Sequence, residues 1–146
     1  MSAELSPERQ FDFWLGLWDV SWGEGKDEGG TNRVELLFDG KVVQENFDAP
    51  SLSFQGMSLS VYDARDELWR QTWADNQGNY WTFTGRFQDG RMILSTEDMV
   101  DGQPVWLRMV FYNITTGSID WNWERSLDGG ENWELRWHIH YRRKQE

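Results

Sequence analysis

Residues 118–126 read SIDWNWERS, and the alternation of their side chains decides the fold. Successive side chains of a β-strand point to opposite faces, so residues two apart share a face. The two faces separate cleanly, with Ile119, Trp121, Trp123 and Arg125 on one and Asp120, Asn122, Glu124 and Ser126 on the other. The first face is largely aromatic and the second is polar. This contrast predicts an antiparallel strand with one side toward a core and the other toward solvent.

The same two-residue period continues along the chain from Trp18 onward. Eleven tryptophans occur in 146 residues, and pairs of them recur two or four positions apart. Aromatic faces arise in three more segments, from Trp69, Gln71 and Trp73, from Trp81, Phe83, Gly85 and Phe87, and from Trp133, Leu135, Trp137, Ile139 and Tyr141. We predict strands at 18–23, 31–38, 41–47, 53–62, 68–75, 80–88, 91–97, 105–113, 118–126 and 133–143.

Short turns separate most of these strands. Asp39-Gly40 and Asp89-Gly90 are two-residue hairpin signals, and segment 24–30 (EGKDEGG) reads as a polar, glycine-rich loop. About ten strands joined mostly by hairpins predict an all-β, antiparallel up-and-down β-barrel, because closure removes the two exposed edges of the sheet. A two-sheet sandwich is the structural alternative.

A short helix is expected before the first strand. Ser6 suits its N-cap and Pro7 its first position, while Phe11, Trp14 and Leu15 fall on one helical face. We place this helix at about 7–15, covering one end of a barrel that spans about 18–143. Residues 1–146 are interpreted as a single domain.

Composition narrows the classes of partner. The 14 basic and 25 acidic residues give a formal net charge of −11, which opposes binding to nucleic acid. Cysteine is absent, so disulfides and thiol chemistry are excluded. No apolar run approaches the roughly 18 residues of a membrane span, and residues 1–10 lack the features of a secretory signal. We expect a soluble, cytoplasmic protein with no membrane partner.

A barrel of this size is either filled by its own side chains or holds one small ligand. Gly56 and Gly85 interrupt the rings of the inward faces and favour a cavity. The predicted binding residues are Trp69, Gln71, Trp73, Trp81, Phe83, Trp121, Trp123, Arg125 and Trp137. Gln71 and Arg125 would orient the ligand, although Arg125 can also reach solvent from a strand end. The predicted function is binding of a small hydrophobic or aromatic molecule, without a cofactor.

Two other functions stay open at this point. The first is a small barrel enzyme that uses His138 and His140, which stand two apart on the predicted outer face. Such a pair can chelate a metal together with Glu134, but Arg136 and Arg142 flank it and repel cations, so no metal site is predicted. The second is a barrel packed solid, acting through its surface or as a homodimer.

The segment SLDGGENW at 126–133 fits the pattern S-x-D-x-G-x-x-W. It resembles the Asp box of sialidase-like propellers, a hairpin turn in which Ser126 and Asp128 bond to backbone and Trp133 packs beneath. Propellers carry several copies and this chain has one. We interpret the segment as a folding element and not as a sign of glycosidase activity.

Gly16-Leu17-Trp18 resembles the G-x-W signature of lipocalins and related calycin barrels. The resemblance implies that Trp18 closes the barrel base and packs against an arginine of the last strand, Arg142 or Arg136. Longer matches, in FDFWLGLWDV, from YDARDELW to GRFQDGR, and in SIDWNWERSLDGGENWELRW, resemble an uncharacterised bacterial family of lipocalin-like domains with no established activity. A looser similarity to nitrobindin-type barrels implies haem ligation by His138 or His140.

Overall fold

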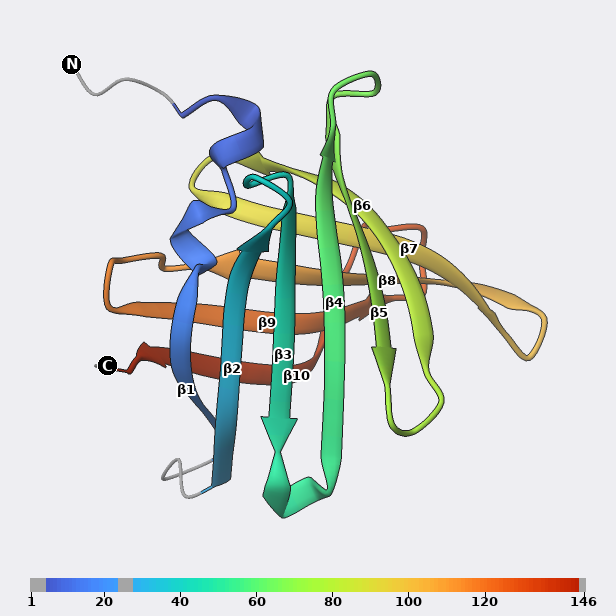
Figure 1. Cartoon of the computed structure of the whole chain (residues 1–146). Helices are drawn as coiled ribbons and strands as arrows, with labels where there is room; N and C mark the ends of the chain where they lie inside the picture. The colour runs from blue at the N-terminus through green and yellow to red at the C-terminus, as the bar shows by residue number, and fades with distance from the viewer. Residues whose placement is uncertain (1–4, 24–27, 145–146) are drawn as a thin grey trace.

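The computed structural model describes residues 5–23 and 28–144, and within them ten antiparallel strands close into a barrel (Figure 1). The strands follow one another around the barrel, and β1 completes it by pairing with both β2 and β10. Their bounds are β1 Gly16–Trp22, β2 Glu28–Leu37, β3 Val42–Ala49, β4 Phe54–Asp63, β5 Leu68–Asp75, β6 Tyr80–Gln88, β7 Arg91–Val100, β8 Gln103–Tyr112, β9 Ser118–Ser126 and β10 Glu134–Arg143. The predicted up-and-down barrel is confirmed, and the sandwich alternative is wrong.

Turn chemistry explains how the hairpins form. Asp89 and Gly90 both have positive φ (53° and 76°) and link β6 to β7 directly, as a two-residue turn requires. Asp101 and Gly102 do the same between β7 and β8, a hairpin that the sequence prediction missed. The predicted two-residue turn at Asp39-Gly40 is longer, because β2 ends at Leu37 and β3 begins at Val42. Of the predicted loop 24–30, residues 28–30 belong to β2 and residues 24–27 lie outside the described residues.

The predicted short helical segment before the barrel is confirmed. It consists of two 3-10 turns, η1 Pro7–Arg9 and η2 Asp12–Trp14, instead of one continuous α-helix over 7–15, and the Ser6 side chain makes no capping hydrogen bond. Side chains three residues apart share one face of a 3-10 turn. Phe11 and Trp14 therefore point the same way, and their rings stack with centroids 5.0 Å apart. This geometry lets both rings enter the end of the barrel.

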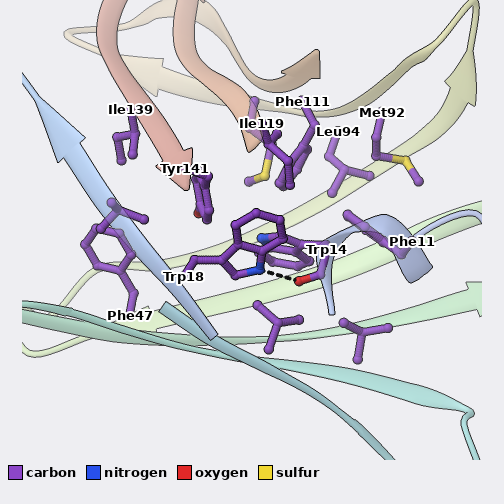
Figure 2. Close-up of a cluster of buried hydrophobic side chains, with 14 of the residues drawn as sticks. Phe11, Trp14, Trp18, Phe47, Met92, Leu94, Phe111, Ile119, Ile139 and Tyr141 are labelled. Carbon is purple, nitrogen blue, oxygen red and sulfur yellow. Dashed lines mark hydrogen bonds between the residues drawn. The ribbon is translucent and has the colours of Figure 1, made fainter. Parts of the chain in front are cut away.

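The end of the barrel beneath these turns is filled with side chains (Figure 2). Phe11 and Trp14 pack against Phe111 of β8, and the Trp18 indole donates a hydrogen bond to the Trp14 carbonyl at 2.8 Å. The apolar residues Met92, Leu94, Ile119 and Ile139 complete this buried cluster. We call this region the closed end.

The closed end is sealed from outside by Arg143, the last residue of β10. Its guanidinium lies 4.2 Å from the Trp18 ring centroid and donates to the carbonyls of Leu15 (2.6 Å), Phe13 (3.4 Å) and Thr116 (2.7 Å). Gly16 has a φ of +125°, which L residues rarely adopt, and a Cβ there would also meet this guanidinium, so the position of Gly16-Leu17-Trp18 calls for glycine. The resemblance pointed to Arg142 or Arg136, and this is corrected to Arg143 because the register pairs Trp18 with Arg143.

The turn between β9 and β10 has the geometry expected from its motif. Ser126 Oγ accepts a hydrogen bond from the Gly130 amide at 2.8 Å, and Asp128 Oδ1 accepts one from the Asn132 amide at 2.9 Å. Gly129 and Gly130 have positive φ, and the Trp133 indole donates to the Gly130 carbonyl at 3.0 Å. The interpretation as a folding element is consistent with these bonds, because each of them fixes the turn itself.

A β-bulge corrects the predicted faces of β10. The register shifts between Leu135 and Trp137, so an extra residue stands opposite β9 there. Trp137 faces the interior, whereas Leu135 is 59% exposed. Trp133 also lies outside, where the Arg108 guanidinium covers its ring at 4.0 Å. The prediction from two-residue spacing was wrong here, because beyond a bulge the odd-numbered residues point to the opposite face of the strand. Leu135 and Trp137 therefore do not share a face.

Candidate functional site

A cavity of about 300 Å³ occupies the barrel interior between the closed end and the opposite end. Trp14 and Phe111 form its floor, since they belong to the packed cluster beneath it. At the other end it reaches the exposed turn after β5, at Gln77 and Asn79. Aromatic and apolar side chains make up most of the wall: Phe47, Phe54, Trp73, Trp81, Phe83, Met109, Trp121, Trp123, Trp137 and Ile139.

Most of the predicted binding residues line this cavity. They come from four strands, β5, β6, β9 and β10, whose inward faces were expected to converge. Those in the wall are Gln71, Trp73, Trp81, Phe83, Trp121, Trp123 and Trp137. Whether they bind a ligand stays a prediction. The structure establishes that alternation along separate strands brings them to one space.

Two of the predicted residues lie elsewhere. Trp69 belongs to the closed end, where its ring meets Phe11 edge-on at 5.0 Å, because β5 begins at that end. Arg125 stands at the end of β9 and pairs with Glu134, with 2.8 Å between Nη2 and Oε2. Its side chain is 34% exposed, so the guanidinium keeps part of its hydration instead of being buried. The expectation that Arg125 orients a ligand is therefore not met by its position.

The two glycines that suggested a hollow interior do not create it. A Cβ at Gly56 would collide with the Trp73 ring, and one at Gly85 would collide with the backbone at Ile93. Gly56 thus makes room for an indole of the neighbouring strand, and Gly85 allows close approach of β7. The cavity exists, but the argument from these glycines was wrong.

A buried carboxylate in the cavity wall is the main feature that the sequence prediction missed. Glu45 on β3 is only 6% exposed. Its Oε1 accepts from Ser58 Oγ at 2.6 Å, and its Oε2 accepts from Asn32 Nδ2 at 2.7 Å. Asn32 Nδ2 also donates to Tyr141 Oη at 2.9 Å. These four side chains, from β2, β3, β4 and β10, form one hydrogen-bonded group that we call the Glu45 cluster.

Burial changes the acid–base properties of the Glu45 cluster. Desolvation raises the pKa of Glu45 from 4.5 to about 7, against the opposing hydrogen bonds from Ser58 and Asn32. Burial also raises the pKa of Tyr141, and the nearby Glu45 carboxylate adds to that effect. The cavity thus holds a carboxyl group that changes charge near neutral pH, beside a phenol that stays protonated.

One more polar atom in the cavity wall is buried without a hydrogen-bond partner among the described residues. Gln71 donates from Nε2 to Ser60 Oγ at 3.0 Å, but its Oε1 accepts nothing. Gln71 lines the cavity, and an unpaired buried polar group is costly unless something satisfies it. The site therefore offers one free acceptor to a bound molecule.

The alternation of β3 contained a signal for the missed carboxylate. Val43, Glu45, Phe47 and Ala49 share a face, and the other three are apolar. A carboxylate on an otherwise apolar face of a strand indicates a buried acid, just as the aromatic faces of β5, β6, β9 and β10 indicate inward side chains. Asn32 gave a similar signal, because it shares a face of β2 with Val34 and Leu36. Ser58 gave none, because on β4 the apolar residues Met57, Leu59 and Val61 occupy the opposite, outward face.

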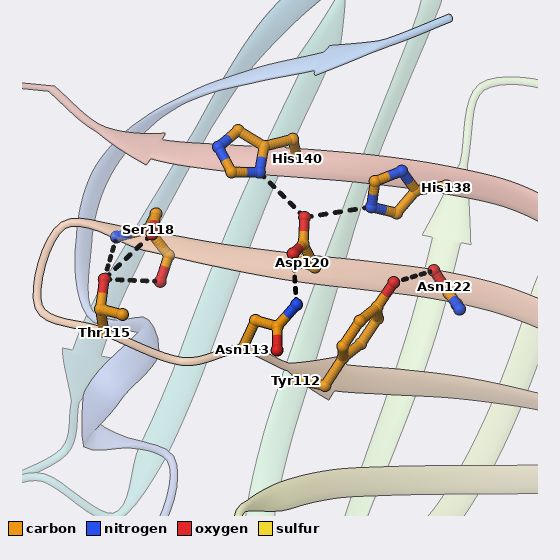
Figure 3. Close-up of polar contacts among 8 residues, drawn as sticks. All are labelled: Tyr112, Asn113, Thr115, Ser118, Asp120, Asn122, His138 and His140. Carbon is orange, nitrogen blue, oxygen red and sulfur yellow. Dashed lines mark hydrogen bonds and ion pairs between the residues drawn. The ribbon is translucent and has the colours of Figure 1, made fainter.

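His138 and His140 lie on the outer face of the barrel, as the sequence predicted (Figure 3). Both contact Asp120 Oδ1, at 3.1 Å from His138 Nε2 and 2.9 Å from His140 Nδ1. Burial raises the pKa of Asp120, but hydrogen bonds from His140, Asn113 and His138 outweigh this and lower it. Neither imidazole enters the interior, so neither His138 nor His140 is placed to ligate a haem bound there. Among the described residues, no group of three acidic, histidine or cysteine side chains is placed to hold a metal ion.

Comparison with known proteins does not place the chain in a family. No protein-family model matches the chain, and no curated protein matches it in sequence. The closed ten-strand barrel is consistent with a lipocalin-like fold. None of the helical segments among the described residues has the length and apolar character needed to cross a bilayer.

Proposed function

We propose that this barrel binds a small, mostly apolar aromatic molecule in its interior, as a lipocalin-like binding protein. The cavity carries the proposal, because its volume of about 300 Å³ is at the lower limit of typical small-molecule sites. The wall also has the composition of such sites, with many aromatic rings and a few placed polar groups. An interior of this kind argues against the alternative of a barrel packed solid.

Ring geometry supports aromatic ligands in particular. The rings of Trp121 and Trp123 are nearly parallel, 4° apart, with centroids separated by 6.4 Å. Trp123 also meets Phe83 edge-on at 5.9 Å, and Trp137 meets Trp121 edge-on at 6.2 Å. A flat apolar molecule entering this space gains stacked and edge-to-face contacts in addition to the burial of its surface.

Titration with N-phenyl-α-naphthylamine tests the proposal, because this neutral apolar probe accepts energy from excited indoles. We expect saturable quenching of tryptophan emission with one probe per chain. Trp123→Leu should weaken binding by about 10-fold, because a large ring contact disappears. The matched control is Trp133→Leu, which removes an indole outside the barrel and should leave the affinity unchanged.

Native mass spectrometry of freshly purified protein provides a second measurement. A co-purifying small molecule, lost on mild activation, would support an occupied cavity and supply the ligand for identification. Quenching that does not saturate, or that changes equally in Trp123→Leu and Trp133→Leu, would contradict binding inside the barrel.

A further inference from the structure

We propose that the ligand carries a protonated amine, held between the Glu45 carboxylate and the surrounding indole rings. This inference rests on the proposed function and assigns the chemical class of its ligand. Three properties of the cavity support it: the sign of its charged groups, the buried acceptors in its wall and the ring faces beside them.

The charged groups of the cavity wall all have one sign. Glu45 and Asp75 line it, whereas no lysine, arginine or histidine of residues 5–23 and 28–144 lines it. Partial burial raises the pKa of Asp75, but hydrogen bonds from Trp73 and Asn79 outweigh it and lower the pKa, so Asp75 is ionised at neutral pH. The protein as a whole has a formal charge of −11. This field attracts cations to the cavity and repels anions.

Glu45 has no cationic partner among the described side chains. Its two oxygens accept only from the neutral groups of Ser58 and Asn32. A buried carboxylate is costly unless a positive charge compensates it, and desolvation accordingly raises its pKa. A ligand ammonium would supply the missing charge, and each carboxylate oxygen has a second lone pair with which to accept from it.

The other features of the wall fit the same group. Gln71 is 3% exposed, and its Oε1 is a buried acceptor without a donor. Register connects it to Glu45 through β4, since Glu45 pairs with Ser58 and Gln71 pairs with Ser60. Both acceptors therefore stand on the wall formed by β3, β4 and β5. Indole faces attract cations most strongly among aromatic rings, and five tryptophans line the remaining space: Trp73, Trp81, Trp121, Trp123 and Trp137.

Three ligands of one shape and different charge test this inference: para-phenylbenzylamine, para-phenylbenzyl alcohol and para-phenylbenzoate. Calorimetric titration at about pH 8, where Glu45 is ionised, should show the amine binding at least about 10-fold more tightly than the alcohol. The benzoate should bind most weakly, because two carboxylates repel it.

Glu45→Gln identifies the responsible group. We expect the preference for the amine over the alcohol to fall to within about 3-fold, while the affinity for the alcohol stays unchanged. Glu97→Gln is the matched control, because it removes one negative charge from the outer face of β7 and should retain the full preference.

A pH titration of the unmodified protein provides the same test without a variant. Protonation of Glu45 below about pH 7 should reduce the preference for the amine. The titratable groups that share the cavity are Tyr141, which stays protonated, and Asp75, which stays ionised, so Glu45 alone changes charge there. Asp75→Asn should leave this pH dependence in place.

Equal affinity for amine and alcohol in the unmodified protein would overturn the inference and leave the proposed function standing. A preference that persists in Glu45→Gln, or that does not change with pH, would also overturn it. If none of the three ligands bind and N-phenyl-α-naphthylamine does not bind either, the proposed function itself fails. The two failures are therefore distinguishable.

Discussion

The two ends of this barrel use the same kinds of residue to opposite effect. At the closed end, Trp14 and Trp18 are buried, packed among apolar neighbours and sealed by Arg143. Toward the other end, Trp121 and Trp137 are only partly buried and line the cavity of about 300 Å³. A single strand can contribute to both ends: β9 contains Ile119 of the packed cluster and Trp123 of the cavity wall.

This contrast shows that the N-terminal segment divides the interior. Phe11 and Trp14 belong to the segment before β1 and insert into the end of the barrel. They fill the space between β8 and β5, where Phe111 and Trp69 contact Phe11. No comparable segment among the described residues enters the other end. We infer that the closed end provides most of the stability and that the open end is free to serve binding. Three substitutions separate these roles, in order of their expected effect.

Trp18→Ala should be the most destabilising of the three. Removing a fully buried indole leaves a cavity, and such changes cost about 3–5 kcal/mol. It also deprives Arg143 of its ring contact. Chemical denaturation monitored by far-UV circular dichroism measures the change. A loss below about 1 kcal/mol would show that the closed end does not carry the stability of the barrel.

Glu45→Gln should stabilise the protein at alkaline pH. Between about 4.5 and about 7 the folded protein keeps a proton on Glu45 that the unfolded chain releases. Stability from this group is therefore fully present below about 4.5 and is lost as pH rises toward about 7, at a total cost of about 3 kcal/mol. The variant should lack this dependence, and the difference between the two proteins should level off above about pH 7.

Denaturation at several pH values from about 4.5 to about 8 measures this effect. Among the described residues, four carboxyl groups have lowered pKa values and act in the opposite direction, as pH falls toward their ordinary value of 3.8: Asp63, Asp75, Asp120 and Asp128. Both proteins keep these groups, so their effect cancels in the difference between the two pH profiles. Parallel pH profiles for the two proteins would show that Glu45 is not desolvated in the folded state.

Trp123→Leu should have the smallest effect on stability although it removes the same ring. Its indole lines the existing cavity, so the substitution enlarges that cavity instead of creating one, at about 1 kcal/mol. Denaturation under the conditions used for Trp18→Ala makes the comparison direct. Equal losses at positions 18 and 123 would contradict the division of the barrel into a packed end and a binding end.

Much of the site was predictable, because a β-strand converts spacing into direction without reference to the rest of the fold. The alternation in β5, β6 and β9 placed Gln71, Trp81 and Trp123 on inward faces, and all three line the cavity. The prediction failed where a position along the barrel axis mattered. Trp69 and Arg125 have inward positions in their strands, but they lie at opposite ends, outside the cavity.

The remaining errors have local causes. One extra residue at the β10 bulge turned Leu135 outward, and no composition rule marks that site. Three-residue spacing of Phe11 and Trp14 suits an α-helix and a 3-10 turn alike, so the sequence did not separate them. Glu45 was missed although its apolar neighbours on β3 marked it as an inward position.

The sequence by itself determined the strands, most of their facing and the all-β class, since each depends on periods and turns a few residues long. Tertiary structure alone decided where the interior is packed and where it is hollow, because that depends on how far each strand is displaced along its neighbour. It also brought Asn32, Glu45 and Tyr141 into contact across separations of up to 109 residues. The pKa of Glu45 follows from that assembly, because desolvation is a property of the whole surrounding barrel.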